Sequence, residues 1–274
     1  MSEIEGIFDL LKTVYGHFGF TFKLTLSTRP VKFMGDIETW NEAEDQLRRA
    51  LTRFKGDDWT VNPGDGAFYG PKIDITISDA LKRELQCATI QLDYQAPINF
   101  NMSYSTDTAG GTARPVVIHR AIMGSFERFT GILTEHFGGK WPFWLSPRQI
   151  LIVPVSSRQD DYADELRRML VADKFHVDVD VRDHTLNKKI RCGQQAQYNF
   201  IFGEYFPRRG VVVVNFPYTN HLIVVGHEEE KTRTVNVRNR DEPESQARGA
   251  LVPVDEVRLK LKSLKKERRL ANTL

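Results

Sequence analysis

Hydrophobic residues at the start of the chain recur at helical spacing, and the pattern then changes to alternation. The helical set predicts an amphipathic helix and comprises Ile4, Ile7, Phe8, Leu11, Val14, Tyr15 and Phe18. Phe20 to Leu26 alternates as a strand, and Trp40 to Phe54 has the spacing of a second helix. Long alternating segments follow around Ile73 to Ile77 and Ala88 to Tyr94. This pattern predicts an α+β unit dominated by an antiparallel sheet.

The pattern of hydrophobic residues changes between Leu145 and Gln149. The apolar run that follows, from Ile150 to Val155, predicts a strand. The next segments predict a helix, a strand, a helix and a strand, at Asp160 to Asp173, His176 to Val181, Leu186 to Phe200 and Leu222 to Val225. This βαβαβ order favours an α/β module with a mainly parallel sheet. A C-terminal helix is also predicted, with a solvated basic face and an inner face of Val257, Leu261, Leu264 and Leu270.

Composition adds limits to this two-part organisation. The 274 residues, of which 41% are hydrophobic, allow one large or two ordinary domains with a real core. No stretch reaches the roughly 18 to 20 apolar residues of a membrane span, and the N-terminus lacks a targeting pattern, so a cytoplasmic location is expected. Cys87 and Cys192 cannot form a disulfide framework or a metal knot, and they are interpreted as ordinary thiols. The net charge of +2 does not by itself indicate nucleic-acid binding.

The segment from Pro115 to Gln149 combines a predicted strand with the start of a helix. Val116 to Ile118 forms the strand, and helical spacing from Phe126 to Phe137 places the helix start near Gly124 and Ser125. Free backbone N–H groups and the helix dipole suit such a start for phosphate or carboxylate, and Arg128 can add a fork of donors. Because strand, turn and helix recur in every α/β protein, the pattern alone favours a structural interpretation.

The amino-acid sequence of this segment resembles that of a known family. HRAIMGSFERF followed by GGKWPFWLSPRQ is similar to motif 3 of class II aminoacyl-tRNA synthetases, in particular threonyl-tRNA synthetases of the eukaryotic type. The resemblance extends upstream through FGFTFKLTLSTRPVKFMGDIETW, GDGAFYGPKIDI and QCATIQLDYQAPINF, and downstream through TLNKKIR, AQYNF and VNVRNR. It implies part of an α+β class II catalytic domain at residues 1–147 and an α/β anticodon-binding domain at 148–274. It also implies a threonine–tRNA ligase, which activates threonine with ATP to an adenylate and transfers it to tRNA(Thr).

Such chemistry depends mainly on charge stabilisation and positioning. In the resemblance, Arg128 matches the motif 3 arginine that lies against ATP, and Gly124 and Ser125 keep the backbone close to the nucleotide. The structural alternative for Arg128 is a surface salt bridge with Glu127 or Glu135.

The glycine-rich segment GDGAFYGPK lacks the order of a phosphate-binding loop and on its own predicts a turn. With the resemblance, Tyr69 is expected to line the threonine pocket and Lys72 to be a cation on the nucleotide side. Gln86, Thr89 and Gln91 match the strand that recognises amino acid and adenylate, and Tyr69, Gln91 and Arg128 are the predicted catalytic set. Regular alternation places Gln86 and Gln91 on opposite faces, so both reach one site only if the strand begins late or carries a bulge.

His119 on its own is interpreted as a hydrogen-bonded structural residue. In the resemblance it matches one of three zinc ligands, the others being a Cys and a His from upstream. Zinc with three protein ligands keeps a position open, which can bind the amino group and hydroxyl of threonine and so distinguish it from valine. Neither cysteine of this chain, and none of its other histidines, matches the two missing ligands.

Motif 1, which builds the dimer interface, and motif 2, which carries another ATP-binding arginine, are not matched. The chain is therefore expected to be the C-terminal part of a longer enzyme that binds ATP with Mg²⁺ and Zn²⁺ as a homodimer. Alone, it is expected not to hold zinc tightly or form threonyl-adenylate. The alternative is a synthetase-like protein that binds RNA without catalysis. Tyr69, Gln91, His119 and Arg128 argue against it, because a binding module has little chemical reason to keep them.

The second domain is expected to bind the anticodon through basic and polar side chains, which can pair with phosphates and unstacked bases. Asn187, Lys188, Lys189 and Arg191 lie at a predicted helix start, and Arg238 and Arg240 alternate along a predicted strand. The alternative is a soluble basic surface. Residues of about 202–221 are extra relative to the family pattern, and either a lineage-specific loop or an in-frame translated intron explains them.

Overall fold

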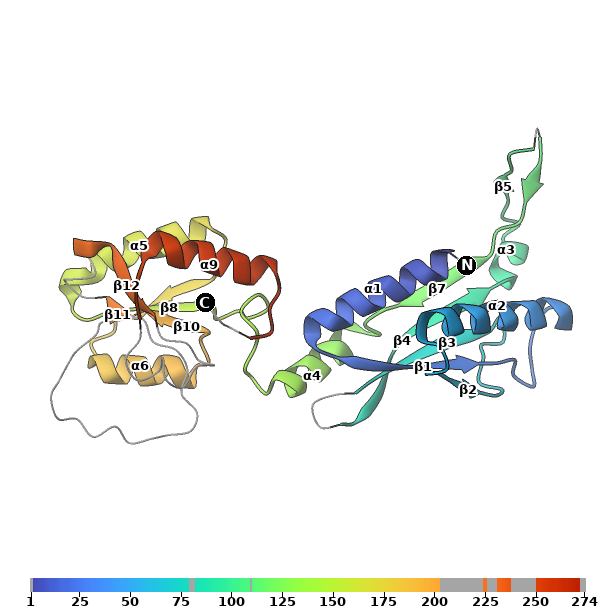
Figure 1. Cartoon of the computed structure of the whole chain (residues 1–274), viewed down its shortest axis with the longest axis horizontal. Helices are drawn as coiled ribbons and strands as arrows, with labels where there is room; N and C mark the ends of the chain where they lie inside the picture. Colours follow the sequence, from blue (N-terminus) through green and yellow to red (C-terminus); the bar gives the residue numbers. More distant parts are fainter. Residues whose placement is uncertain are drawn as a thin grey trace. The chain divides into compact units, whose positions relative to one another are not determined.

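The chain folds as two units, Met1–His136 and Phe137–Leu274, called unit 1 and unit 2 below. A computed structural model describes residues 2–78, 82–108, 110–202, 224–225, 231–237 and 250–271 (Figure 1). The predicted insertion at about 202–221 lies almost entirely outside the described residues.

Unit 1 is built on a five-stranded sheet with strand order β2-β1-β3-β4-β7. Its strands are β1 (Thr21–Ser27), β2 (Thr60–Asn62), β3 (Lys72–Ser78), β4 (Glu84–Asp93) and β7 (Val117–Ala121). Only the β1–β2 pair is parallel within this sheet. Helices α1 (Ser2–Phe18) and α2 (Ile37–Lys55) lie over one face of it (Figure 1). The predicted helices and the predominantly antiparallel sheet are therefore confirmed.

The same periodicities explain the core of unit 1. Six residues that alternate with polar neighbours along three strands are at most 3% exposed, namely Leu24, Leu26, Ile73, Ile75, Ile90 and Leu92. Trp40, Leu47 and Leu51 are buried on the inner face of α2. That helix is capped at its start by Asp36, whose Oδ1 accepts the Thr39 N–H at 2.7 Å.

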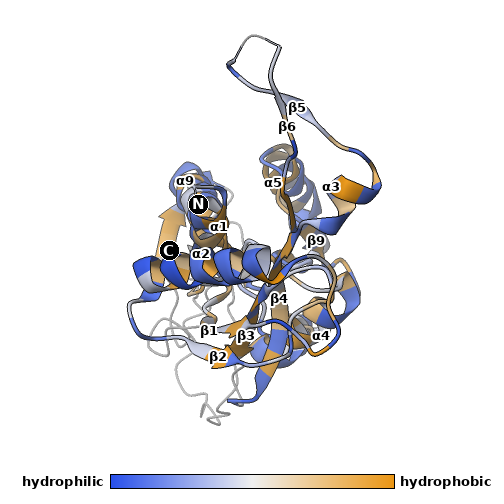
Figure 2. Ribbon diagram, turned by 90° about the vertical axis from the view of Figure 1, so that its right-hand side faces the viewer, coloured by the Kyte–Doolittle hydropathy of each residue, from blue (hydrophilic) through white to orange (hydrophobic). Residues whose placement is uncertain are grey.

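After β4 the chain leaves the sheet and returns to it. Helix α3 (Gln95–Asn99) precedes a short hairpin of β5 (Tyr104–Ser105) and β6 (Thr112–Ala113), which extends away from the sheet (Figures 1 and 2). Strand β7 then leads into α4 (Phe126–Phe137), whose start agrees with the prediction. Phe129 is buried in α4, whereas Phe126 is 80% exposed and faces solvent.

Unit 2 has a parallel sheet in which β8 is central. Strands β9, β10 and β11 all pair with β8 in parallel, and β12 pairs with β13 antiparallel. Their bounds are β8 (Ile150–Pro154), β9 (Val177–Val179), β10 (Phe200–Phe202), β11 (Val224–Val225), β12 (Thr234–Val237) and β13 (Ala250–Pro253). The mainly parallel sheet was predicted, and it is confirmed.

Helices cover both faces of the parallel sheet. Ile150 and Ile152 contribute to the cluster that holds the buried faces of α5 (Asp160–Ala172) and α9 (Val254–Lys266). Leu151 and Val153, with the opposite orientation, pack against residues of α6 (Leu186–Gln195). Figure 1 shows α6 across the sheet from α5 and α9. The short helix η1 (Ser157–Gln159) precedes α5.

Two predictions about helices in unit 2 are wrong. The helix expected at Leu186 to Phe200 ends at Gln195, because Gln197 adopts a positive φ of 60° and Phe200 begins β10 as a fully buried residue. Leu270 is 41% exposed and not on the inner face of the last helix, because α9 ends at Lys266. Val257, Leu261 and Leu264 are buried as predicted.

Asp173 joins α5 to α9 through two ion pairs. Its Oδ2 accepts from Arg258 Nε and its Oδ1 from Lys262 Nζ, both at 2.7 Å. The hydrogen bond from Arg258 lowers the pKa of Asp173, against the opposing effect of burial. Because the folded-state pKa lies below the unfolded value of about 3.9, this stabilisation is complete above that pH and is lost as pH falls through the folded-state pKa.

Asp173→Asn is therefore expected to lower the free energy of unfolding by about 1 to 2 kcal/mol at pH 7. The difference from wild type should shrink as pH falls below about 4. Urea denaturation at pH 7 and at pH 3 measures both values. A difference that stays constant between the two pH values would show that ionisation of Asp173 does not stabilise the fold.

Candidate active site

Along the strands of unit 1, polar residues alternate with the buried apolar ones, and they lie on the opposite face of the sheet. Ser27 pairs with Lys72, Lys72 with Gln91, and Gln91 with His119, so one row crosses β1, β3, β4 and β7. Thr25, Asp74 and Thr89 form the next row. Since successive side chains point to opposite faces, these residues share the face opposite the apolar core. Four predicted site residues, Lys72, Thr89, Gln91 and His119, are thereby brought together.

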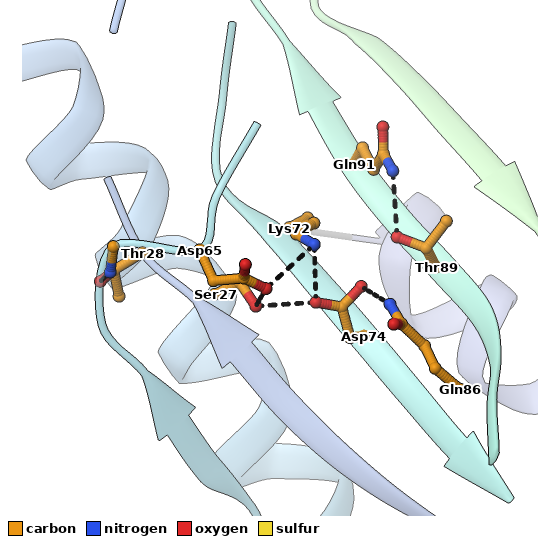
Figure 3. Close-up of polar contacts among 9 residues, drawn as sticks. Ser27, Thr28, Asp65, Lys72, Asp74, Gln86, Thr89 and Gln91 are labelled. Atoms are coloured by element: carbon orange, nitrogen blue, oxygen red, sulfur yellow. Dashed lines mark hydrogen bonds and ion pairs between the residues drawn. The ribbon is translucent and has the colours of Figure 1, made fainter. Parts of the chain in front are cut away.

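A β-bulge in β4 adds Gln86 to this face. Ile75 pairs with Ala88 but Thr76 pairs with Gln86, so Cys87 is an extra residue on β4. The bulge reverses the alternation, and Gln86 Nε2 donates to Asp74 Oδ1 at 2.7 Å (Figure 3). The condition under which Gln86 and Gln91 could share a site is therefore met.

Lys72 lies between two carboxylates. Its Nζ is 3.0 Å from Asp74 Oδ2 and 3.3 Å from Asp65 Oδ2, and Ser27 Oγ donates to the same Asp74 oxygen at 2.7 Å (Figure 3). Burial favours the neutral amine, but the interactions with Asp74 and then Asp65 outweigh it and raise the pKa of Lys72. Lys72 is thus a charged ammonium that is already paired, and a phosphate would have to share it.

Tyr69 and Gln91 form a hydrogen-bonded chain on this face. The Tyr69 hydroxyl donates to Gln91 Oε1, and Gln91 Nε2 donates to Thr89 Oγ1 at 3.2 Å. Burial, followed by the charge of Asp93, raises the pKa of Tyr69, so the hydroxyl remains a donor. The chain fixes which end of the Gln91 amide faces each neighbour.

Tyr69 also lines a cavity of about 220 Å³. The other lining residues include Trp40, Tyr94, Gln95 and Arg114. Gly70 holds the Tyr69 loop against β4, because a Cβ at Gly70 would be 1.9 Å from the carbonyl oxygen of Leu92. Only glycine allows this approach, and it sets the position of Tyr69 relative to Gln91.

His119 contacts Asp93, a residue that the sequence did not indicate. His119 Nε2 lies 2.9 Å from Asp93 Oδ2, while Asp93 Oδ1 accepts the N–H groups of Gln95 and Ala96 at 2.8 and 2.9 Å. Burial would raise the pKa of Asp93, but these hydrogen bonds, with that from Ala96 the strongest, lower it. The ionised carboxylate only accepts, so Nε2 carries a proton and Nδ1 is the ring nitrogen left for a ligand.

The described residues do not by themselves fit a zinc site. No cluster of three or more His, Cys, Asp or Glu side chains with metal-binding geometry occurs in the described part of the chain. His119 offers one nitrogen, whereas a catalytic zinc site takes three protein ligands.

The start of α4 lies against the β4 bulge. Gly124 has a φ of +65°, and a Cβ there would be 2.8 Å from the carbonyl oxygen of Cys87. Ser125 Oγ accepts the Arg128 N–H at 3.2 Å and so caps the first turn. Glu135 is paired with Arg83, and the exposed Arg128 guanidinium has no ion pair or hydrogen bond with any residue that the structure describes. An arginine that is open to solvent at the start of α4, near Cys87 of the bulge, suits an anionic ligand.

The predicted anticodon residues differ in accessibility. Lys188 and Arg191 are exposed on α6, whereas Lys189 is 6% exposed and its Nζ donates to the Pro154 carbonyl at 3.3 Å. Arg238 and Arg240 lie outside the described residues, as does the side chain of Asn187.

Sequence reasoning missed four polar residues of the unit 1 face, namely Ser27, Asp65, Asp74 and Asp93. One signal was available, because Lys72 and Asp74 alternate with Ile73 and Ile75 and therefore share a face. Among the described helices, none has the length and apolar character needed to cross a membrane.

A mainly antiparallel sheet with helices on one face and a polar opposite face is the arrangement expected of a class II synthetase core. Residues 1–137 match the family described as "tRNA synthetase class II core domain (G, H, P, S and T)", and residues 149–214 match "Anticodon binding domain". The chain belongs to the class II tRNA synthetase core-domain family, and the predicted fold class is confirmed.

Similar proteins confirm the resemblance to threonyl-tRNA synthetases. The chain is 50% identical to "Threonine--tRNA ligase, cytoplasmic" of Saccharomyces cerevisiae over 100% of its own length and 34% of the relative's. It is 54% identical to "Threonine--tRNA ligase 1, cytoplasmic" of Rattus norvegicus over 88% of its length and 32% of the relative's. A crystal structure of the "RNA binding domain of Threonyl-tRNA synthetase" from Cryptosporidium parvum aligns with a TM-score of 0.83 and 44% identity, covering 96% of this chain and 60% of that one. The chain thus spans about a third of the length of these curated relatives.

Proposed function

We propose that the chain is the C-terminal part of a cytoplasmic threonine–tRNA ligase, which activates threonine with ATP and transfers it to tRNA(Thr) as a homodimer. The observation that carries the proposal is the polar face of the unit 1 sheet. Tyr69, Gln91 and Lys72 lie together at one end of it, and the start of α4, with its open Arg128, lies against the bulge of the same strand β4. The match to threonine–tRNA ligases along the whole chain supports it.

From the geometry we infer separate roles in threonine binding and in nucleotide binding for these residues. Tyr69 and Gln91, joined by a hydrogen bond, bind and orient threonine. The nucleotide side consists of Lys72, Gln86, Thr89, Gly124, Ser125 and Arg128. A threonine carboxylate oxygen attacks the α-phosphorus of ATP, and pyrophosphate leaves. Arg128 and the N–H groups of the α4 start stabilise the charge on the phosphates, and Mg²⁺ bound with ATP neutralises part of it.

His119 and Asp93 do not complete a zinc site in this chain, so no catalytic step is derived through zinc. We propose that His119 supplies one ligand in a longer polypeptide, with Asp93 orienting its ring. In this proposal, residues 1–147 form part of the catalytic domain, and residues 148–274 form the anticodon-binding domain.

Recognition of tRNA(Thr) tests the role of the second domain. The 274-residue chain is expected to bind a tRNA(Thr) transcript about tenfold more tightly than the same transcript with an exchanged anticodon, because unstacked anticodon bases are recognised individually. Fluorescence anisotropy at moderate salt measures both dissociation constants. Arg238→Ala with Arg240→Ala should weaken binding. Equal affinity for the two transcripts would contradict anticodon recognition.

The intact mass of the endogenous polypeptide separates the ligase from a non-catalytic RNA-binding protein. Capture with an antibody against residues 141–149, followed by mass spectrometry, should give a mass well above the 31.5 kDa of this chain. The captured protein should also catalyse threonine-dependent exchange of pyrophosphate into ATP. A mass near 31.5 kDa without exchange would favour the RNA-binding alternative.

A further inference from the structure

Arg182 is held by a buried carboxylate just after strand β9. Asp180 Oδ1 accepts from Arg182 Nε at 2.8 Å, and Oδ2 accepts from Nη2 at 2.6 Å. Oδ1 also accepts the backbone N–H of Arg182 at 3.2 Å. The Asp180 side chain is 3% exposed, whereas that of Arg182 is 58% exposed. One edge of the guanidinium is therefore fixed, and most of the side chain remains open to a ligand.

The pair lies where ligands commonly bind in parallel sheets. Strands β8 and β9 are parallel, so Pro154 and Asp180 lie at their carboxyl ends, at one edge of the sheet. The buried ammonium of Lys189 donates to the Pro154 carbonyl and contributes, after Arg182, to lowering the pKa of Asp180. The exposed Lys188 follows in the first turn of α6. Two cations, Arg182 and Lys189, thus act on one buried carboxylate, and Lys188 lies next to Lys189 in the chain.

Stability alone is a poor reason for this arrangement. An ion pair with an exposed arginine contributes little to stability, and burying the Asp180 carboxylate has a desolvation cost. The two parallel hydrogen bonds from Arg182 to Asp180 instead fix the orientation of the guanidinium. A guanidinium that is already fixed loses less conformational freedom when it binds an anion.

We propose that Arg182 contacts a phosphate of the single-stranded anticodon loop of bound tRNA, and that Asp180 is the positioning residue that aims it. The inference rests on the proposed function, and it adds two residues that the sequence pattern did not indicate. The guanidinium N–H groups that Asp180 does not bind, which lie near the Cys192 side chain, donate to phosphate oxygens, while Lys188 adds positive charge in the first turn of α6.

The experiment compares Arg182→Ala with Arg168→Ala in the 274-residue chain. Arg168 lies on α5, is 69% exposed on its side chain and is paired with Asp164, so both substitutions remove one exposed, paired positive charge. Arg182→Ala should raise the dissociation constant for a tRNA(Thr) transcript about tenfold. It should also reduce the slope of log affinity against log salt by about 0.7, as expected for one lost phosphate contact on a single strand. Arg168→Ala should change affinity less than twofold and leave the slope unchanged.

Two further variants test the positioning role. Arg182→Lys keeps the charge but loses the paired fork, and it should give an intermediate dissociation constant. Asp180→Asn removes a negative charge, which by itself would strengthen RNA binding, so weaker binding with an unchanged thermal unfolding temperature would support positioning. If Asp180→Asn does not fold, Arg182→Lys carries that test.

The outcomes separate this inference from the proposed function. Wild-type binding with equal dissociation constants for Arg182→Ala and Arg168→Ala would overturn the role of Arg182 and leave the anticodon-binding function standing. No binding of tRNA(Thr) by the wild-type chain would overturn both.

Discussion

Gly70→Ala is expected to lower the free energy of unfolding of unit 1 by about 3 kcal/mol or more. The added methyl group would lie 1.9 Å from the carbonyl oxygen of Leu92, which is backbone of β4, a strand paired on both sides, and cannot rotate away. The loop would have to move outward, and the Leu92 N–H bond to the Pro71 carbonyl, at 3.1 Å, would be lost with it. Hydrogen exchange of peptides from β3 and β4 measures the change within unit 1.

A matched substitution separates this contact from the general effect of replacing glycine. Gly131 lies within α4, and a Cβ there would have no neighbouring atom within 4 Å. Gly131→Ala is therefore expected to be neutral or to stabilise by up to about 1 kcal/mol, since alanine is the better helix former. If the β3 and β4 amides of the Gly70→Ala variant exchanged as slowly as those of the Gly131→Ala variant, the loop would not lie as close to β4 as described.

The same contact has a functional consequence. Gly70 follows Tyr69 directly, and the Tyr69 hydroxyl is the donor that orients Gln91. An outward shift of the loop would carry the Tyr69 hydroxyl away from Gln91 and weaken that hydrogen bond, so Gln91 would be less firmly oriented. Under the proposed function, Gly70→Ala should therefore weaken threonine binding as well as lower stability, whereas Gly131→Ala should do neither.

Most elements of the fold could be predicted, because the period of the apolar residues matches the element that forms. Ile73, Ile75 and Ile77 alternate and belong to a strand, and Leu47 and Leu51 recur one turn apart in a helix. Leu186 to Phe200 was predicted too long, since Tyr198 and Phe200 continue the apolar pattern after the helix has ended at Gln195. Periodicity does not distinguish a buried strand such as β10 from another helical turn.

The candidate site was predictable in its residue types but not in its geometry. The resemblance indicated Tyr69, Lys72, Gln91 and Arg128, while alternation left Gln86 dependent on a bulge. Whether Cys87 is an extra residue depends on how β4 pairs with β3, and this register is not written in either strand alone. Asp93 was missed for a similar reason, because its partner His119 is 26 residues away and reaches it only through the pairing of β4 with β7.

The ion pair between Lys72 and Asp74 predicts a second large effect on stability. Lys72→Met would leave the Asp74 carboxylate, whose side chain is 9% exposed, without its counterion. Ser27 and Gln86 would still donate to Asp74, but neither carries a charge. Removing one partner of a buried pair is costly because the other charge stays desolvated, so the free energy of unfolding should fall by about 2 to 4 kcal/mol.

A second substitution tests that explanation. In Lys72→Met with Asp74→Leu, no buried uncompensated charge remains, because Asp65 is 56% exposed and is solvated, and most of the lost stability should return. The exposed pair of Lys23 and Glu84 on the same sheet is the control, because its side chains are 71% and 56% exposed and Lys23→Met should therefore have a much smaller effect. Hydrogen exchange of peptides from β3 and β4 gives the stability of the three variants relative to the wild type. Equal effects of Lys72→Met and Lys23→Met would mean that the hydrogen bonds from Ser27 and Gln86 already compensate the Asp74 carboxylate, and that Lys72 is not needed for the stability of unit 1.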